Sequence, residues 1–451
     1  MDSHYSGYSS SIPLFMNAYL GAPTSATTPL QLTQITPLAS TGIKNVEVGT
    51  IDPAQFERIP EKHFTEMKQL AKLEGVKLSM HAPPVLDMAG FDQQSNRWSE
   101  YARKNAEVYL RDFLEKASKL QDDTKIQVPM VIHASGHIQA KDNLHWEPEA
   151  VDTKTGSKGK WVADVMTFVN PESGQMVPLE KEERFYPDST ESRIMTPEDR
   201  LAELNRGQWE QTQLQVTNYI YELEETKKRA GEIEAGLGGI KEAMAQKRPL
   251  TEDEQNRLNI ANQQILNLQS REVLLGQYLS SAVVSNFDKL YRSKDYYDIN
   301  SIEPDITNVT QREQLKKRYE QFYKNLPAER DKFLSDYKNV VIPAVRELQQ
   351  AGTALDADRT NAQKYNAYMV VKGKYDQALL NYSSKIFNQF REWQQQELVP
   401  QTFVPVEHFA KKKAPETWSN ALYDSYKKLG ADKLPIMAVE NWDVKYPMGL
   451  G

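Results

Sequence analysis

The sequence predicts a protein of class α/β plus all-α, in which about five parallel strands in βα units are interrupted by a large insertion of long helices. Short apolar runs alternate with amphipathic stretches as far as residue 137, and the same pattern returns after residue 415. Between these segments the chain becomes polar and rich in turns, and then shows long helical periods with caps and short breaks. We therefore expect one α/β domain built from both ends of the chain.

The expected α/β domain consists of the segments 1–137 and 415–451. Apolar runs with the length and the flanking turn residues of parallel strands occur at 13–19, 45–49, 76–81, 128–133 and 434–440. Amphipathic helices are expected where apolar residues recur every three or four positions, at 60–73, 96–120 and 416–429.

The expected insertion has two parts, a polar arm at 138–195 and a helical lobe at 196–414. In the arm, the apolar run 161–169 and the turn residues 170–174 predict a β-hairpin. The lobe begins at Thr196, a capping residue followed by a proline and two acidic residues. Helical periods then cover roughly 196–246, 251–291, 310–350 and 356–396, with the last break at Ala351-Gly352-Thr353. Such long helices with short breaks predict antiparallel hairpins or a coiled-coil bundle, with the aromatic and leucine stripe as its core.

Composition excludes several classes of protein. The net charge of −7 argues against a protein that coats nucleic acid, although it leaves a DNA substrate open. The absence of cysteine excludes disulfides and thiolate sites, so any metal ion must bind His, Asp or Glu. No apolar run approaches the roughly 18 residues of a membrane span, and the polar start lacks a secretory signal. We therefore expect a cytoplasmic protein of two or three domains that does not enter a membrane.

The most informative feature is a set of three metal-binding residue types at predicted strand ends. His81, His133 and Glu440 are the last residues of three apolar runs. The carboxyl ends of parallel strands meet at one edge of a sheet, where α/β folds keep their chemistry. Imidazole and carboxylate groups bind zinc and other divalent ions such as manganese. For each histidine alone, the alternative is a core or rim side chain that hydrogen-bonds to the backbone.

At these residues the chain resembles the endonuclease IV family, the zinc-dependent apurinic/apyrimidinic endonucleases within the xylose-isomerase-like TIM barrels. The resemblance lies in His81-Ala82-Pro83 with Leu86-Asp87-Met88-Ala89, in His133-Ala134-Ser135-Gly136-His137 and in Glu440-Asn441. It implies that His81, His133 and Glu440 bind metal, that the strands are the first five of a TIM barrel, and that the protein is a DNA-repair hydrolase acting on abasic or damaged DNA. The sequence departs from the family pattern at Pro84, where the family has Tyr, and at Ala134-Ser135-Gly136, where it has Pro-Gly-Ser.

In that family, further Asp, His and Glu ligands lie on strands six to eight, which have no counterpart in this chain. We therefore expect further sequence or a second polypeptide to complete the barrel and the site. His137, Asp87 and Glu47 are candidates for contacts with the ligands or the substrate. A loop histidine and solvated carboxylates are the simpler explanation of these three.

Two alternative functions stay open. One is a sugar isomerase or epimerase of the same barrel superfamily, which would use a divalent ion and carboxylates to move a proton or hydride. The other is a non-catalytic scaffold or assembly protein built on a remnant of the barrel, because an open sheet edge invites another chain to pair with it. A scaffold predicts a homo-oligomer that forms through this edge or through the helical lobe.

Overall fold

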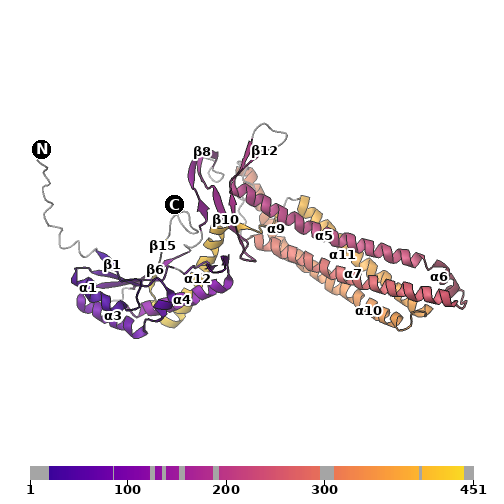
Figure 1. Cartoon of the computed structure of the whole chain (residues 1–451), viewed down its shortest axis with the longest axis horizontal. Helices are drawn as coiled ribbons and strands as arrows, with labels where there is room; N and C mark the ends of the chain where they lie inside the picture. Colours follow the sequence, from indigo (N-terminus) through magenta and orange to yellow (C-terminus); the bar gives the residue numbers. More distant parts are fainter. Residues whose placement is uncertain are drawn as a thin grey trace. The chain divides into compact units, whose positions relative to one another are not determined.

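The computed structural model describes residues 20–84, 86–121, 127–134, 139–151, 158–185, 192–294, 309–395 and 399–440. The chain divides into two compact units (Figure 1). Unit 1 contains residues 1–152, 157–201 and 403–451, and unit 2 contains residues 153–156 and 202–402. Residues 403–414, expected in the helical lobe, thus belong to unit 1, because Phe409, Ala410 and Ala414 are buried in it.

Unit 1 is built on a five-stranded parallel sheet. Its strands follow chain order, namely β1 (Gly21–Pro23), β2 (Asn45–Gly49), β3 (Lys77–His81), β6 (Pro129–His133) and β15 (Ile436–Glu440). Four of the expected strands are confirmed, and the one expected at 13–19 lies outside the described residues. Over the described part of the chain the sheet is open, with β1 and β15 as its edge strands.

Helices cover one face of this sheet (Figure 1). The main ones are α1 (Ile35–Ser40), α3 (Glu61–Glu74), α4 (Glu100–Ser118) and α12 (Val406–Leu429), and the shorter elements are η2 (Gln31–Gln34), α2 (Pro53–Glu57) and η5 (Ala431–Lys433). The core lies between the helices and the sheet, where fully buried Met80, Met130 and Ile132 meet Phe64, Leu110 and Phe113. Because side chains alternate along a strand, His81 and His133 point to the opposite face.

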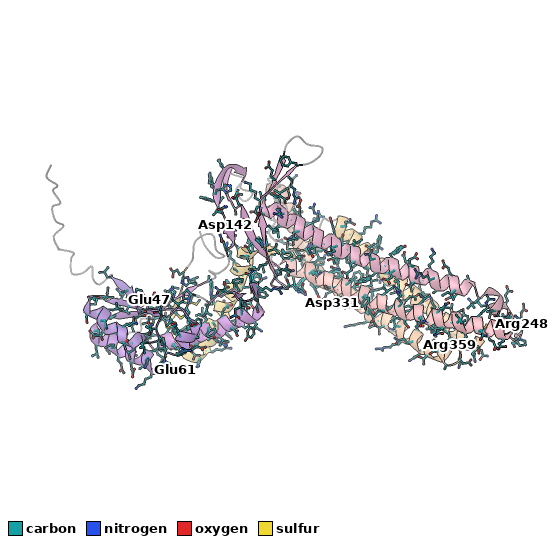
Figure 2. All side chains as sticks on the ribbon, viewed as in Figure 1. Glu47, Glu61, Asp142, Arg248, Asp331 and Arg359 are labelled. Atoms are coloured by element: carbon teal, nitrogen blue, oxygen red, sulfur yellow. The ribbon has the colours of Figure 1, made fainter. Side chains whose placement is uncertain are left out.

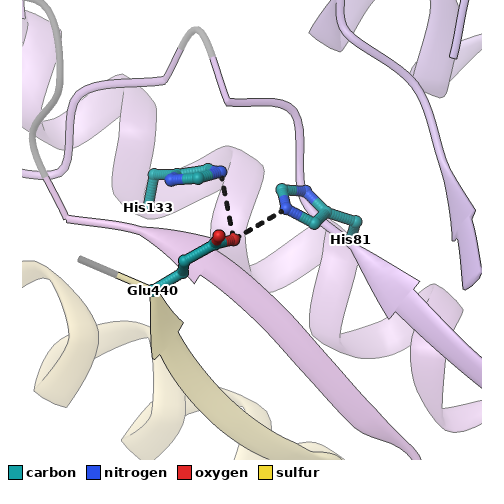
Figure 3. Close-up of side chains that lie close together, drawn as sticks. All are labelled: His81, His133 and Glu440. Carbon is teal, nitrogen blue, oxygen red and sulfur yellow. Dashed lines mark hydrogen bonds and ion pairs between the residues drawn. The ribbon is translucent and has the colours of Figure 1, made fainter. Parts of the chain in front are cut away.

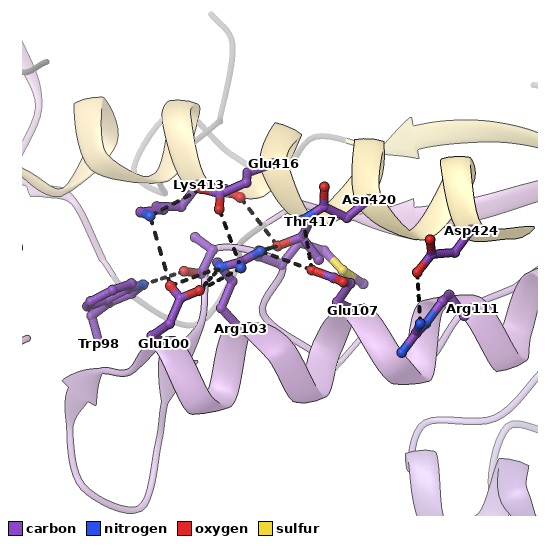
Figure 4. A network of polar contacts seen from close by, with 12 residues as sticks. Trp98, Glu100, Arg103, Glu107, Arg111, Lys413, Glu416, Thr417, Asn420 and Asp424 are labelled. Atoms are coloured by element: carbon purple, nitrogen blue, oxygen red, sulfur yellow. Dashed lines mark hydrogen bonds and ion pairs between the residues drawn. The ribbon is translucent and has the colours of Figure 1, made fainter.

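A buried polar network joins α4 to α12 across the insertion (Figure 4). The Arg103 side chain is 3% exposed, and its guanidinium pairs with Glu100 at 2.6 Å, Glu107 at 3.3 Å and Glu416 at 3.4 Å. It also donates to Thr417 Oγ1 at 3.2 Å, and this hydroxyl in turn donates to the Met88 carbonyl at 2.8 Å. The network therefore holds the returning helix against the first half of the domain.

Short antiparallel strands form the rest of unit 1. Strands β10 (Val165–Val169) and β11 (Met176–Glu180) make the hairpin expected around residues 170–174, and β7 (Lys141–Asp142) and β14 (Val404–Pro405) also pair with β10. Trp161 belongs to a separate strand, β9 (Lys158–Val162), which pairs with β8 (His145–Val151). Two more pairs are β4 (Phe91–Asp92) with β5 (Arg97–Trp98), and β12 (Glu182–Phe185) with β13 (Ser192–Met195).

Unit 2 is an up-and-down bundle of long helices. These are α5 (Pro197–Ala235), α6 (Gly238–Ala245), α7 (Glu252–Ser293), α9 (Val309–Asp336), the π-helical η4 (Tyr337–Val341), α10 (Ile342–Asp356) and α11 (Ala362–Gln395). Arg248, just before α7, and Arg359, between α10 and α11, lie at the same end of the bundle (Figure 2). Trp209, Phe287, Phe390 and Trp393 contact one another in the core.

The helix break expected at Ala351-Gly352-Thr353 is wrong, because α10 continues to Asp356. Gly352 is an interhelical contact point rather than a helix end. A Cβ atom at this position would lie 3.2 Å from Oε1 of Gln269 and 3.3 Å from the Leu266 side chain on α7. Helix α11 instead begins after Asn361, whose side-chain oxygen accepts from the backbone N–H groups of Gln363 and Lys364.

Candidate metal centre

Three strands deliver the three expected ligands to one edge of the sheet. His81, His133 and Glu440 are the last residues of the neighbouring strands β3, β6 and β15. The register places Glu440 beside His133, and His81 beside Val131. All three side chains therefore project from the sheet face that lies opposite the helices (Figure 3).

The ligand atoms of these residues converge. Nε2 of His81 lies 3.4 Å from Oε2 of Glu440, and Nε2 of His133 lies 3.6 Å from the same oxygen. One donor atom from each residue lies within 4.8 Å of the other two. Within the described residues this is the one group of three or more such side chains arranged to hold a metal ion.

These separations suit a shared metal ion better than direct ion pairs. Charge-assisted hydrogen bonds between nitrogen and oxygen are shorter, at about 2.7–2.9 Å. Two ligands about 2.1 Å from a tetrahedral zinc ion are roughly 3.4 Å apart, which matches both histidine–glutamate separations.

Hydrogen bonding prepares His81 for coordination through Nε2. Its Nδ1 lies 2.7 Å from the carbonyl oxygen of Ala82. A carbonyl only accepts hydrogen bonds, so Nδ1 is the donor in this contact, and Nε2 is the nitrogen that faces Glu440 and would coordinate an ion bound between them. Histidine ligands in metalloproteins are commonly oriented by such a contact.

The exposure of the three side chains differs in a way that leaves the site open to solvent. The His133 side chain is 10% exposed and that of His81 is 20% exposed, whereas that of Glu440 is 55% exposed. Three protein ligands leave at least one coordination position for water or substrate. Of the three ligands, the Glu440 carboxylate is the most exposed to solvent.

Gly49 at the end of β2 makes room for His81, and the sequence patterns did not single it out. The two residues are register partners, and a Cβ atom at position 49 would lie 3.0 Å from both Cβ and the carbonyl oxygen of His81. The sequence signal for this role is a glycine at the end of one predicted strand when the neighbouring strand ends in a histidine. The backbone here is extended, so the glycine is needed for space and not for an unusual conformation.

Asp87 shapes the loop after β3 and does not join the ligands. It is 5% exposed, and its Oδ1 accepts hydrogen bonds from the backbone N–H groups of Ala89 at 2.9 Å and Gly90 at 3.0 Å. The neighbouring Met88 N–H donates to the Ala134 carbonyl at 3.0 Å, just after His133. The expectation of a solvated carboxylate is therefore wrong for Asp87, whose role is to fix the loop between the two histidine strands.

Of the other two expected neighbours of the site, only Glu47 belongs to the part of the chain that the structure describes. Glu47 lies in β2, two residues before Gly49 (Figure 2). It is not part of the group of converging ligand atoms. His137 lies outside the described residues.

Among the described residues, no helix is both long enough and apolar enough to cross a membrane. Comparison of the chain with protein-family models, with curated proteins and with solved structures yields no match.

Proposed function

We propose that unit 1 binds a divalent metal ion through His81, His133 and Glu440, and that it is a phosphodiesterase similar to endonuclease IV, acting on abasic or damaged DNA. The observation that carries this proposal is the convergence of two imidazoles and a carboxylate at the ends of three neighbouring parallel strands. Zinc is the first choice of ion for this ligand set, and manganese the second.

The residues of the proposed metal centre have different roles. His81 and His133 supply neutral nitrogen ligands on a rigid sheet, and Glu440 supplies one negative charge. When bound, the ion would offer Lewis-acid stabilisation of phosphate charge and a water molecule of lowered pKa. The Ala82 carbonyl holds the His81 ring in place, and Gly49 leaves the space that this ring position requires.

The architecture supports a relation to the first five strands of a TIM barrel. The strands follow chain order, helices cover one face, and the candidate site lies at the carboxyl edge, as in such barrels. On the face opposite the helices, Ile436 of the edge strand β15 is 52% exposed. We propose that further strands, from a second polypeptide or a second copy of the chain, pair with this edge and add the ligands that a multi-metal site needs.

The proposed activity is tested by incubating the full chain with a DNA duplex that carries one abasic site, with zinc or manganese supplied. Nicking at the abasic site is expected from the wild-type chain together with any co-purifying partner. His81→Ala should abolish nicking, whereas His63→Ala, which removes a histidine from helix α3 of the same unit, should preserve it. Equal activity of the two variants would show that the nicking arises elsewhere.

The same preparation distinguishes the alternatives. Turnover of ketoses with manganese, and none of DNA, would favour a sugar isomerase or epimerase. A chain that binds no metal but forms a defined oligomer would favour a scaffold, and either result would overturn the nuclease proposal.

A further inference from the structure

A layer of ionisable side chains crosses the core of the unit 2 bundle. Glu272 on α7 is completely buried, and Lys372 on α11 is 5% exposed. The Lys372 ammonium pairs with the Asp376 carboxylate at 2.7 Å, one turn further along α11. From α5, the Lys227 ammonium donates to the backbone carbonyl of Asp376 at 3.3 Å. Among the described residues, the hydrogen bonds of both lysines thus go to Asp376 rather than to Glu272.

Neither carboxylate oxygen of Glu272 has a hydrogen-bond partner among the described residues. One turn earlier on α7, Gln269 accepts a hydrogen bond from the Tyr368 hydroxyl at 3.1 Å, and the uncharged Gly352 of α10 lies against it. One turn later, a Cβ atom at Gly276 would lie 3.3 Å from the Leu379 side chain. Glu272 is therefore enclosed at a closely packed level of the bundle.

An ionised carboxylate is very costly in such surroundings, because burial removes its hydration and no donor replaces it. Burial raises the pKa of Glu272 to about 7; Lys372 and Lys227 oppose this rise, whereas Asp376 and Glu234 add to it. The neighbouring Tyr368 and Tyr375 also have raised pKa values, mainly through burial, so they stay neutral over the same range.

We propose that Glu272 is a proton-controlled switch in the helical bundle: it is packed as a neutral acid, and loss of its proton loosens α7 from α5 and α11 at this level. The pKa is raised in the packed state, so the protonated carboxyl favours packing. The packed state is then most stable below pH 4.5, and it loses stability as the pH rises from 4.5 to about 7. Above that range Glu272 is ionised in both states, and its effect on packing is constant.

The test is hydrogen exchange of the full chain, expressed as protection factors so that the chemical pH dependence of exchange is removed. In the wild type, protection of backbone amides around Glu272 and Lys372 should fall on the order of 50-fold between pH 5 and pH 7.5. In Glu272→Gln this fall should be absent, because the amide is neutral at every pH. Glu210→Gln removes an exposed carboxylate from α5 and should behave as the wild type does.

Two outcomes would overturn the switch. One is wild-type protection that does not change with pH, and the other is a Glu272→Gln variant that keeps the wild-type pH dependence. If Glu272→Gln fails to fold, carbon-13 NMR of glutamate carboxyl groups in the wild type decides the matter. A carboxyl resonance that titrates near pH 7 supports the proposal, and the absence of any glutamate titrating above pH 6 contradicts it.

Discussion

The carboxylate of Glu440 lies 3.4 Å from the imidazole of His81, although 359 positions in the sequence separate the two residues. The whole helical bundle of unit 2 lies between them in the chain. Parallel pairing of β15 with β6 brings the carboxylate to the edge where His81 ends β3. The sheet thus assembles a candidate metal centre from both ends of the chain.

Zinc should stabilise unit 1, because an ion that binds only the folded site shifts the unfolding equilibrium. At a free zinc concentration 100 times the dissociation constant, the free energy of unfolding of unit 1 should rise by about 2.7 kcal/mol. Urea titrations with zinc and with a chelator measure this difference. His133→Ala should remove the zinc effect, whereas His63→Ala should retain it; a zinc effect that survives His133→Ala would place the ion elsewhere.

Gly49→Ala should weaken metal binding without removing a ligand. The added methyl group would press on Cβ and the carbonyl oxygen of His81 and move its ring. Mutation of a residue that orients a metal ligand typically lowers the metal affinity about tenfold or more. Calorimetric titration with zinc can resolve such a difference. Gly21→Ala is the matched control, because a Cβ atom there would only approach Asn45 to 3.4 Å. Equal affinities of the two variants would show that Gly49 does not position His81.

Arg103→Ala should destabilise unit 1 by about 2 kcal/mol, because it leaves Glu107 and the Thr417 hydroxyl without their buried donor. Arg111→Ala breaks a second pair between the same two helices, with Asp424 at 2.8 Å, but that arginine is 36% exposed. Its loss should cost less than about 1 kcal/mol. Urea unfolding measures the loss of unfolding free energy in each variant. An equal loss in Arg111→Ala and Arg103→Ala would show that burial of the arginine does not determine its contribution to stability.

Thr251→Ala should lower the stability of unit 2 by about 1 kcal/mol. Thr251 caps α7 by accepting from the Glu254 N–H, while the Glu254 carboxylate accepts from the Thr251 N–H. Thr217→Ala, at an exposed position within α5, should be neutral or slightly stabilising because alanine has the higher helix propensity. The thermal unfolding temperature should therefore fall for Thr251→Ala but not for Thr217→Ala, and an equal fall in both variants would exclude the capping role.

Sequence periodicity predicted most of the elements that position the site. Strands 45–49, 76–81, 128–133 and 434–440 are local patterns of apolar residues, and each appears in the sheet within two residues of its expected start. Their carboxyl ends were therefore recognisable before the fold was known. The adjacency of Glu440 and His133 needed a further assumption, namely that the chain returns to the same sheet after the insertion.

Features that depend on partners distant in the sequence could not be predicted in this way. Glycine is a residue type that often ends helices, but Gly352 lies inside α10, where it packs against Gln269 and Leu266 of α7. Arg103 carries a charge on the buried side of α4, and besides Glu100 and Glu107 of the same helix it contacts Glu416 and Thr417 of α12, which lie more than 300 positions away in the sequence. The closeness of Gly49 to His81 likewise exists only once β2 and β3 are paired.

Anomalous X-ray diffraction at the zinc edge, from crystals of the full chain grown with zinc, tests the central claim most directly. A peak is expected between Nε2 of His81, Nε2 of His133 and the Glu440 carboxylate, about 2.1 Å from each ligand atom. A peak at other residues only, or an ordered site with no anomalous signal between these three side chains, would contradict it.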